Sequence, residues 1–375
     1  MSKNSTIIGF GSPSRYFQGH GQLNRLESYS RGFGRKVLAL IDPFFFAEMT
    51  IRLESLYAAG YSTIITEEFR VEITEKEINR VTAVAEETMA EVIIGIGGGK
   101  TLDTAKAVGH HRNIPIVVVP TTASTDAPCS ALSIVYKENG KYSHALWYPK
   151  NPDVVLVDLD IIIKAPIRFL IAGMGDALAT YFEARANQES DSLNYVNYED
   201  GGYKRSQAAM ALAELSYKIL LEDGLKAKVA AENGVCTKAL ENVIEANTLL
   251  SGLGFENAAT AGAHSIANGL TALPENHKTL HGEKVAFGVI CQLVIENRPT
   301  EELHRVIDFC LSVGLPITLE ELQVEATLEN IRIIAEESMA YTWSSEPFSV
   351  TSNMVYDAIF ATDKYVHHYK KSMFT

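Results

Sequence analysis

The stretch HKTLHGEK, residues 277 to 284, places His277 and His281 four residues apart. In a helix, side chains at positions i and i+4 lie on the same face, and this is a spacing that two metal ligands on a helix use. Two imidazoles do not complete a metal site, so other ligands must come from elsewhere in the chain. The stretch therefore suggests a metal site and leaves open whether both histidines belong to it.

Two residues of the second half could supply the missing ligands. Asp176, in GMGDALATYFEA, lies inside an otherwise apolar helical pattern, where a carboxylate is costly unless it is paired or bound to a cation. His264, in ATAGAHSIANGL, is surrounded by small residues that let other groups approach closely. Together with His281 they would give the three protein ligands of a catalytic zinc or of a ferrous 2-His-1-carboxylate site. From spacing alone, ordinary core or surface residues remain the alternative.

A glycine-rich stretch, GIGGGKT at residues 95–101, follows an apolar run and precedes a helical pattern. Glycines let the backbone approach a phosphate, and the N–H groups of a helix start bind the anion. The P-loop needs a glycine at position 94, which is Ile94, and the Rossmann fingerprint needs one at position 100, which is Lys100. The stretch is therefore interpreted as a phosphate-binding loop of another type, with a plain tight turn as the alternative.

Two acids follow predicted strands. Asp42 ends the run KVLALID, at the carboxyl edge of a sheet, where it could accept hydrogen bonds from a ribose diol and repel a 2′-phosphate. This would favour NAD over NADP, although an acid before Pro43 also forms turns. Asp126 lies in PTTASTDAPCSALSIVY (120–136), a hydroxyl-rich loop that could hold a nicotinamide ribose or a substrate hydroxyl, or be only a loop.

The elements that must position these residues differ between the two halves of the chain. Uninterrupted apolar runs at 36–42, 91–99, 113–120 and 153–158 alternate with helical patterns at 76–91 and 101–111, which predicts a doubly wound, mostly parallel sheet. From residue 166 the patterns at 165–187, 206–234 and 237–254 are helical. We expect an α/β dinucleotide-binding domain over 1–165 and an all-α metal-binding domain over 166–375, with the active site in the cleft between them.

Composition narrows the function further. The chain has 375 residues and a net charge of −13, which argues against nucleic acid as a partner because phosphates require a basic surface. No apolar run approaches the length of a membrane span, and the first residues lack a secretory signal pattern. Four cysteines without metal-ligand spacing suggest free thiols in the cytoplasm.

Taken together, the motifs resemble those of bacterial glycerol dehydrogenases, in the iron-containing, or group III, alcohol dehydrogenase superfamily. The similarity covers about residues 10 to 360 and keeps the order of the family's motifs. They are GIGGGKTLDTAKAVG, PTTASTDAPCSALSIVY, YPKNPDVVLVD, IAGMGDALATYFEA, LSGLGFENA and HGEKVAFG. The resemblance implies a dehydroquinate synthase-like fold and homo-oligomers, often octamers.

The resemblance also implies roles for individual residues. It places one Zn²⁺ per subunit on Asp176, His264 and His281, and it places the substrate's hydroxyls against Asp126, with Asp176 and His264 also lining the substrate site. It puts His277 near the site but outside the ligand set, and we assign it to proton exchange or support of the site. Positions matching the family's NAD site are Asp42, Gly97, Gly98, Gly99, Lys100, Thr101, Asp103, Thr121, Thr122, Ser124, Ser130, Leu132 and Tyr136.

Two positions depart from the family pattern. Iron-dependent relatives carry a histidine four residues after the aspartate, and this chain has Thr180 there, which favours zinc over Fe²⁺. Cys129 stands where many glycerol dehydrogenases have threonine, which leaves the detail of the cofactor pocket open.

The expected reaction is the NAD-dependent oxidation of glycerol, or a related vicinal diol, to dihydroxyacetone by hydride transfer at zinc. One alternative is a 2-hydroxycarboxylate dehydrogenase of the same family, against which Asp126 argues by charge repulsion. Another is a phosphate-handling relative, such as a glycerol-1-phosphate dehydrogenase-like or dehydroquinate synthase-like enzyme. That alternative needs basic residues in the pocket, and the candidates, Lys278 and Lys284, are expected to face solvent. A catalytically silent NAD-binding protein is the third.

Overall fold

The computed structural model describes residues 6–140 and 142–373. One half is built on a six-stranded sheet in which every neighbouring pair is parallel, in the order β1-β8-β5-β4-β2-β3. The strands are β1 (Arg15–Gly19), β2 (Lys36–Ile41), β3 (Thr63–Glu68), β4 (Val92–Gly97), β5 (Ile116–Pro120) and β8 (Val154–Asp158). The predicted parallel sheet is therefore confirmed, and the four predicted runs form β2, β4, β5 and β8.

Helices cover both faces of this sheet. They are α1 (Leu26–Ser30), α2 (Phe46–Ala58), α3 (Glu75–Glu87), α4 (Gly99–Arg112) and α5 (Leu159–Ile162). Along β2, Val37 and Ile41 join one apolar cluster while Leu38 and Leu40 join another, so both faces are buried. Burial on both faces explains why the strands are continuous Val/Ile runs rather than alternating ones.

The sequence patterns missed two kinds of strand. Both edge strands, β1 and β3, are partly exposed and carry polar residues, so neither reads as a continuous apolar run. An antiparallel hairpin of β6 (Leu132–Tyr136) and β7 (Tyr142–Trp147) lies outside the main sheet. Its first strand is the end of the hydroxyl-rich segment that sequence reasoning treated as a loop.

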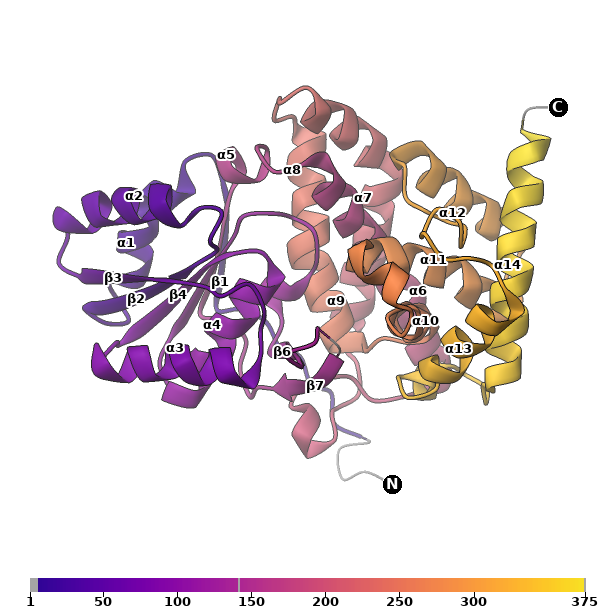
Figure 1. The fold of residues 1–375 in the computed structure, drawn as a ribbon, viewed down its shortest axis with the longest axis horizontal. Coiled ribbons are helices and arrows are strands. Elements are labelled where there is room, and N and C mark those ends of the chain that lie inside the picture. The colour runs from indigo at the N-terminus through magenta and orange to yellow at the C-terminus, as the bar shows by residue number, and fades with distance from the viewer. Residues whose placement is uncertain (1–5, 141, 374–375) are drawn as a thin grey trace.

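The second half is helical, as predicted, and lies beside the sheet half (Figure 1). Its helices are α6 (Ile167–Ser190), α7 (Gln207–Glu232), α8 (Lys238–Glu245), α9 (Ser251–Ala258), α10 (Gly262–Leu270), α11 (His281–Ile295), α12 (Thr300–Val313), α13 (Leu328–Ser338) and α14 (Ser352–Ser372). A π-helical turn, Ala246–Leu250, joins α8 to α9. The predicted boundary after residue 165 falls between α5 and α6, and the division into two domains there stays a prediction.

Helices α6 and α11 approach each other so closely that their backbones touch. A Cβ on Gly282 would lie 1.8 Å from the carbonyl oxygen of Ala172, and one on Gly175 would lie 2.2 Å from the carbonyl oxygen of Gly282. Only glycine fits at such a crossing. The crossing brings the start of α11, where His281 lies, against the middle of α6.

Candidate metal and cofactor site

Three side chains converge where α6, α10 and α11 meet. The Nε2 atoms of His264 and His281 each lie 3.3 Å from Oδ1 of Asp176, and the candidate ligand atoms of the three residues lie within 4.8 Å of one another. Asp176 is fully buried, the His264 side chain is 13% exposed, and that of His281 is 42% exposed. The cluster is therefore closed on the Asp176 side and open on the His281 side.

The chemistry of this cluster fits a cation. Oδ1 of Asp176 is buried and accepts no hydrogen bond from a described residue, although it faces two imidazole nitrogens. Burial by itself would raise the pKa of Asp176, but the neighbouring His281 and His264 outweigh burial and hold that pKa below its usual range. An ionised carboxylate oxygen and two imidazole nitrogens form a donor set suited to zinc or ferrous iron.

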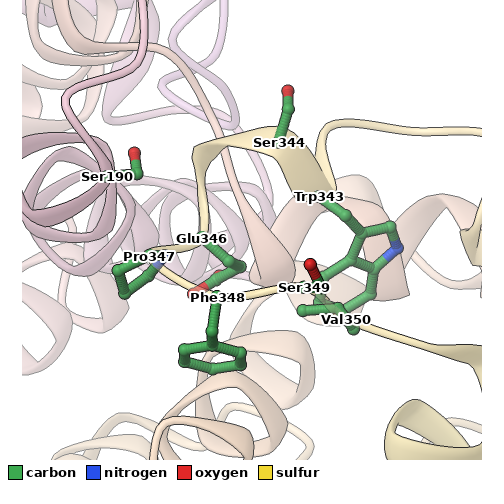
Figure 2. A pocket seen from close by; sticks show the side chains of 8 residues that line it. All are labelled: Ser190, Trp343, Ser344, Glu346, Pro347, Phe348, Ser349 and Val350. Atoms are coloured by element: carbon green, nitrogen blue, oxygen red, sulfur yellow. The ribbon is translucent and has the colours of Figure 1, made fainter.

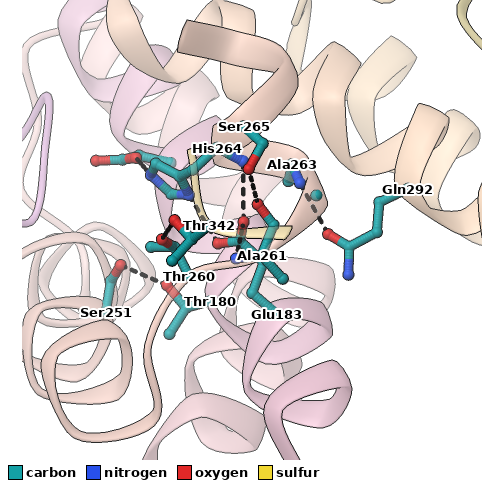
Figure 3. A network of polar contacts seen from close by, with 12 residues as sticks. Thr180, Glu183, Ser251, Thr260, Ala261, Ala263, His264, Ser265, Gln292 and Thr342 are labelled. Atoms are coloured by element: carbon teal, nitrogen blue, oxygen red, sulfur yellow. Dashed lines mark hydrogen bonds and ion pairs between the residues drawn. The ribbon is translucent and has the colours of Figure 1, made fainter. Parts of the chain in front are cut away.

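A buried acid, Glu183, orients His264. Its Oε2 lies 2.7 Å from Nδ1 of His264, and its Oε1 accepts hydrogen bonds from the backbone N–H groups of Ala261 and His264 at 2.8 and 2.9 Å (Figure 3). This pairing favours the tautomer with the proton on Nδ1, so that the neutral ring would present its Nε2 lone pair to a cation beside Asp176. Glu183 lies seven residues after Asp176 on the same face of α6, a spacing from which sequence reasoning could have found it.

Asp126 lies against the same cluster from the sheet side. Its backbone N–H donates to Oδ2 of Asp176 at 3.3 Å, and its own Oδ2 accepts a hydrogen bond from Ser251 at 2.8 Å. Burial raises the pKa of Asp126 well above its usual value, and the charge of Asp176 raises it further. Two adjacent buried acids thus have pKa values that are moved in opposite directions, a pattern typical of sites that separate proton-holding from charge-holding roles.

Thr180 occupies the position where iron-dependent relatives were expected to carry a ligand. Its hydroxyl lies 2.8 Å from the hydroxyl of Ser251 (Figure 3). The Ser251 hydroxyl in turn donates to Asp126. A Cβ on Gly254 would lie 2.3 Å from the Thr180 methyl group, so the side chain is closely packed. Thr180 therefore supports the position of Asp126 through Ser251.

The predicted nucleotide residues gather along the carboxyl edge of β2, β4 and β5. A Cβ on Gly97 would lie 2.6 Å from Oγ1 of Thr101 and 2.9 Å from Cβ of Asp42, so these three residues are in contact only because position 97 is glycine. The N–H of Thr121 donates to the carbonyl of Gly97, which adds the end of β5. Asp42 also accepts a hydrogen bond from the N–H of Phe44, as expected for a turn former.

The start of α4 has the form of an anion site. Gly98 precedes the helix and Gly99 begins it, and a Cβ on Gly98 would meet no atom within 4 Å. No side chain caps this helix end. The hydroxyl oxygen of Thr101 is buried there and has no hydrogen-bond partner among the described residues. Free N–H groups and an unpartnered hydroxyl at a helix start would suit a phosphate.

Other predicted cofactor residues are tied into the protein itself. Asp103 accepts a hydrogen bond from the N–H of Ile134 and pairs with the buried Lys106 at 2.7 Å. Lys106 also donates to the carbonyl oxygens of Ala127 and Ser130, so it fastens the Asp126 loop to α4. Sequence reasoning did not single out Lys106, because a lysine in a helix usually faces solvent.

The remaining predicted cofactor residues line the same region. The hydroxyls of Thr122 and Ser124 lie 3.0 Å apart, and the Lys100 ammonium lies 5.4 Å from the ring centre of Tyr136 while pairing with Glu72. Leu132, at the start of β6, is buried in a small apolar cluster with Phe255 and others. His277 lies in a 3-10 turn, Pro274–Lys278, before α11 begins at His281, so the two histidines do not share one helix as their spacing had suggested. The side chain of His277 lies outside the described residues, so its predicted role is not placed.

The expectation that Lys284 faces solvent was wrong. Its side chain lies on α11 one turn after His281 and is only 8% exposed, and no described acid pairs with it. Burial, with a smaller contribution from the nearby Lys100, lowers its pKa to about 8. Lys278, by contrast, is exposed as expected. The expectation failed because a lysine in a helix usually faces solvent, whereas this helix is packed on nearly all sides.

A hollow of about 510 Å³ lies elsewhere, lined by Ser190 at the end of α6 and by residues of the 343–350 segment (Figure 2). It contains none of the predicted site residues. Glu346 on its wall accepts a hydrogen bond from the N–H of Gly262 at the start of α10, so the wall of this hollow and the helix that carries His264 are connected.

Comparison with known proteins agrees with this fold. The family model "Iron-containing alcohol dehydrogenase" matches residues 13–159. A glycerol dehydrogenase of Escherichia coli O6:H1 is 47% identical over 359 residues, covering 94% of this chain and 96% of the relative. The chain therefore belongs to the iron-containing alcohol dehydrogenase family and is an oxidoreductase.

The similarity within this family is to glycerol dehydrogenases in particular. The glycerol dehydrogenase of Thermotoga maritima is 46% identical, over 94% of this chain and 96% of its own. The structure of a probable glycerol dehydrogenase from Sinorhizobium meliloti superposes with a TM-score of 0.90 at 44% identity, over 96% of this chain and 99% of that one. The resemblance inferred from the motifs is confirmed. Among the described residues, every helix is too short or too polar to cross a membrane.

Proposed function

We propose that this chain oxidises glycerol to dihydroxyacetone with NAD, at a zinc ion held by Asp176, His264 and His281. The observation that carries the proposal is the convergence of two imidazole Nε2 atoms on one buried, unpartnered carboxylate oxygen. The glycerol dehydrogenases at 44–47% identity over nearly the whole chain support glycerol as the substrate.

The choice of zinc over iron rests on the number of protein ligands. Thr180, one turn after Asp176 on α6, is bonded to Ser251 and offers no imidazole. Three protein ligands with one open side are typical of catalytic zinc, although a ferrous site can use the same set. The experiment below therefore decides which metal the site uses.

The residues of the chain would have distinct roles in the reaction. When bound, the metal supplies a Lewis acid that lowers the pKa of a substrate hydroxyl, and NAD accepts the hydride. Glu183 fixes the tautomer and direction of His264. Asp126, held by Ser251, is placed to hydrogen-bond a second hydroxyl of the substrate and to hold a proton.

The nucleotide would lie along the carboxyl edge of the sheet. The phosphates would meet the N–H groups at the start of α4, beside Gly98, Gly99 and Thr101. Asp42, one strand away, would accept hydrogen bonds from the adenosine ribose. An acid at this position disfavours the 2′-phosphate of NADP by charge repulsion, so we expect a preference for NAD.

One observation keeps the phosphate-handling alternative in view. Lys284 is a buried ammonium without an acidic partner among the described residues, one turn from His281. Such a group would be stabilised by an anion. A cofactor phosphate would serve this purpose in a glycerol dehydrogenase, and a phosphorylated substrate would do so in the alternative. A hydroxycarboxylate is less suitable, because its carboxylate would face Asp126 and Asp176.

The deciding experiment measures NAD and NADP reduction with glycerol, 1,2-propanediol, glycerol phosphate and lactate. We expect NADH formation with glycerol and the diol, loss of activity after chelation, and recovery with zinc. Asp176→Asn should lose metal and activity, whereas Asp191→Asn, at the exposed end of the same helix, should keep both. Faster turnover of glycerol phosphate or lactate would replace the proposed substrate, and full activity of a metal-free Asp176→Asn protein would overturn the metal site.

His277 has a separate role in the proposal. It precedes the ligand His281 by four residues and would assist proton exchange without binding zinc. His277→Ala should therefore keep its zinc and lose turnover, and loss of the metal in this variant would place His277 among the ligands. We further propose that the protein is cytoplasmic and forms a homo-oligomer in solution. Light scattering of the purified protein tests the oligomeric state.

A further inference from the structure

A second group of side chains of the types that bind metals lies outside the site described above. His20 follows β1, Cys236 lies in the loop between α7 and α8, and Glu241 lies on α8. Their candidate ligand atoms all lie within 4.8 Å of one another. Among the described residues only one other group of three or more His, Cys, Asp and Glu side chains meets this condition, and that group is Asp176, His264 and His281.

The His20 ring has an acid partner on one side, and both side chains are more than half exposed. Its Nδ1 lies 2.7 Å from Oδ1 of Asp160, and the other oxygen of Asp160 accepts a hydrogen bond from the N–H of Gly21 at 3.0 Å. A carboxylate on one ring nitrogen leaves the other with a lone pair, which is the usual arrangement of histidines that bind metals. The same relationship joins Glu183 to His264 in the candidate active site.

The other two donors are fixed by the backbone around them. Gln18, on β1, donates to the backbone carbonyl of Glu241 at 2.8 Å and so ties the strand to α8. Cys236 directly precedes Thr237, whose hydroxyl accepts the N–H of Leu240 and begins the helix. Lys238 pairs with Glu241 at 3.1 Å, but its side chain is 76% exposed, and exposed pairs of this kind are weak.

Cys236 also differs from the other cysteines. It is only half-buried, whereas Cys129, Cys291 and Cys310 are buried, and all four are free thiols. A thiol that a solvated ion can reach, beside an imidazole and a carboxylate, offers sulfur, nitrogen and oxygen donors together. Thiolate and imidazole ligands select zinc-like ions over magnesium and calcium, which prefer oxygen.

We propose that His20, Cys236 and Glu241 form a second site for a zinc-class divalent ion, which links the sheet half of the chain to the helical half. Asp160 orients His20 in this site, and water would complete the coordination. The site is separate from the proposed catalytic metal, so the chain would bind two equivalents of metal. Its existence does not depend on the proposed function.

Cobalt(II) distinguishes the two sites, because a thiolate ligand gives an intense near-ultraviolet charge-transfer absorption and the Asp176 site contains no cysteine. We would strip the full chain with a chelator and titrate it with Co²⁺. The second equivalent should produce the charge-transfer band. Cys236→Ser and His20→Gln should each lose the band and the second equivalent while keeping glycerol oxidation. Asp176→Asn should lose the first equivalent and keep the band.

Two outcomes would overturn the second site. One is absence of the band in a wild-type protein that binds cobalt at one equivalent, and the other is a band that survives in Cys236→Ser. Thiol alkylation provides an independent measurement in the unaltered chain: iodoacetamide should modify Cys236 in the metal-free protein, and zinc should slow that reaction at least tenfold. An unchanged alkylation rate in the presence of zinc would also contradict the proposal.

Failure of the catalytic proposal would instead appear as a missing first equivalent of bound metal, so the two failures are distinguishable.

Discussion

Glu183 contacts His264 at two places, because its carboxylate lies 2.7 Å from Nδ1 of the ring and accepts the backbone N–H of the same residue, and it also accepts the backbone N–H of Ala261. It therefore holds both the imidazole and the first turn of α10, which carries that imidazole. A negative charge at the start of a helix is itself stabilising, so one buried acid serves the helix and the metal ligand together.

Glu183→Gln should weaken metal binding by roughly 10- to 100-fold, because the amide cannot match the charge that favours the Nδ1–H tautomer. Competition with a chromophoric chelator would measure the affinity. The matched control is Glu189→Gln, on the same helix, which pairs with Arg298 in a partly exposed position. Equal metal affinity in Glu183→Gln and wild type would show that Glu183 has only a structural role.

Gly282→Ala should destabilise the fold and the site together. The added methyl group would lie 1.8 Å from the carbonyl oxygen of Ala172, so α6 and α11 would have to separate and His281 would move away from Asp176. We expect a loss of about 3 kcal/mol or more in the free energy of unfolding. Urea denaturation measures it, with Gly32→Ala as the control, since a Cβ there meets nothing within 4 Å. Similar stabilities of the two variants would contradict the close crossing.

Lys106→Met should be much more damaging than Lys100→Met on the same helix. Removing the Lys106 ammonium would leave Asp103 as a buried acid without its cation and would release the carbonyls of Ala127 and Ser130. Breaking such a buried pair costs about 3–5 kcal/mol. The Lys100–Glu72 pair is largely exposed, and its loss should cost about 0–1 kcal/mol. Denaturant midpoints of the two variants would test this difference.

Glu346→Gln should flatten the dependence of stability on pH. Burial, together with the negative charges of Glu296 and Glu183, raises the pKa of Glu346 to about 8. Between the unfolded value near 4.5 and pH 8, the unfolded chain loses the proton while the folded chain keeps it, so stability falls as pH rises through this window. Because the pKa moves from 4.5 to about 8, wild type should lose up to about 5 kcal/mol more than the glutamine variant as the pH rises from 5 to 9. Thermal melting of both proteins at pH 5 and pH 9 measures this difference. Equal losses of stability in wild type and Glu346→Gln would exclude this role for Glu346.

Much of the fold follows from local sequence patterns. The four buried strands form where continuous Val/Ile runs occur, because a strand buried on both faces has apolar residues at successive positions. The helical half begins where the spacing of apolar residues changes to that of a helix, which buries only one stripe of its surface. The edge strands β1 and β3 escaped notice because each has one open side and tolerates polar residues. The change from strand-rich to helical sequence was equally visible without a structure.

The sequence also showed which residue types are available for the site, but it did not show which of their side chains lie in contact. The motifs of the family indicated Asp176, His264 and His281 as ligands. The pairing of Asp126 with Asp176, the support of His264 by Glu183, and the burial of Lys106 and Lys284 could not be read from spacing. The sequence alone determined which segments are strands and helices and which donors are available. Only the crossing of α6 with α11 at Gly175 and Gly282 decided which donors meet, because contact between residues about 50 to 110 positions apart depends on how whole elements pack.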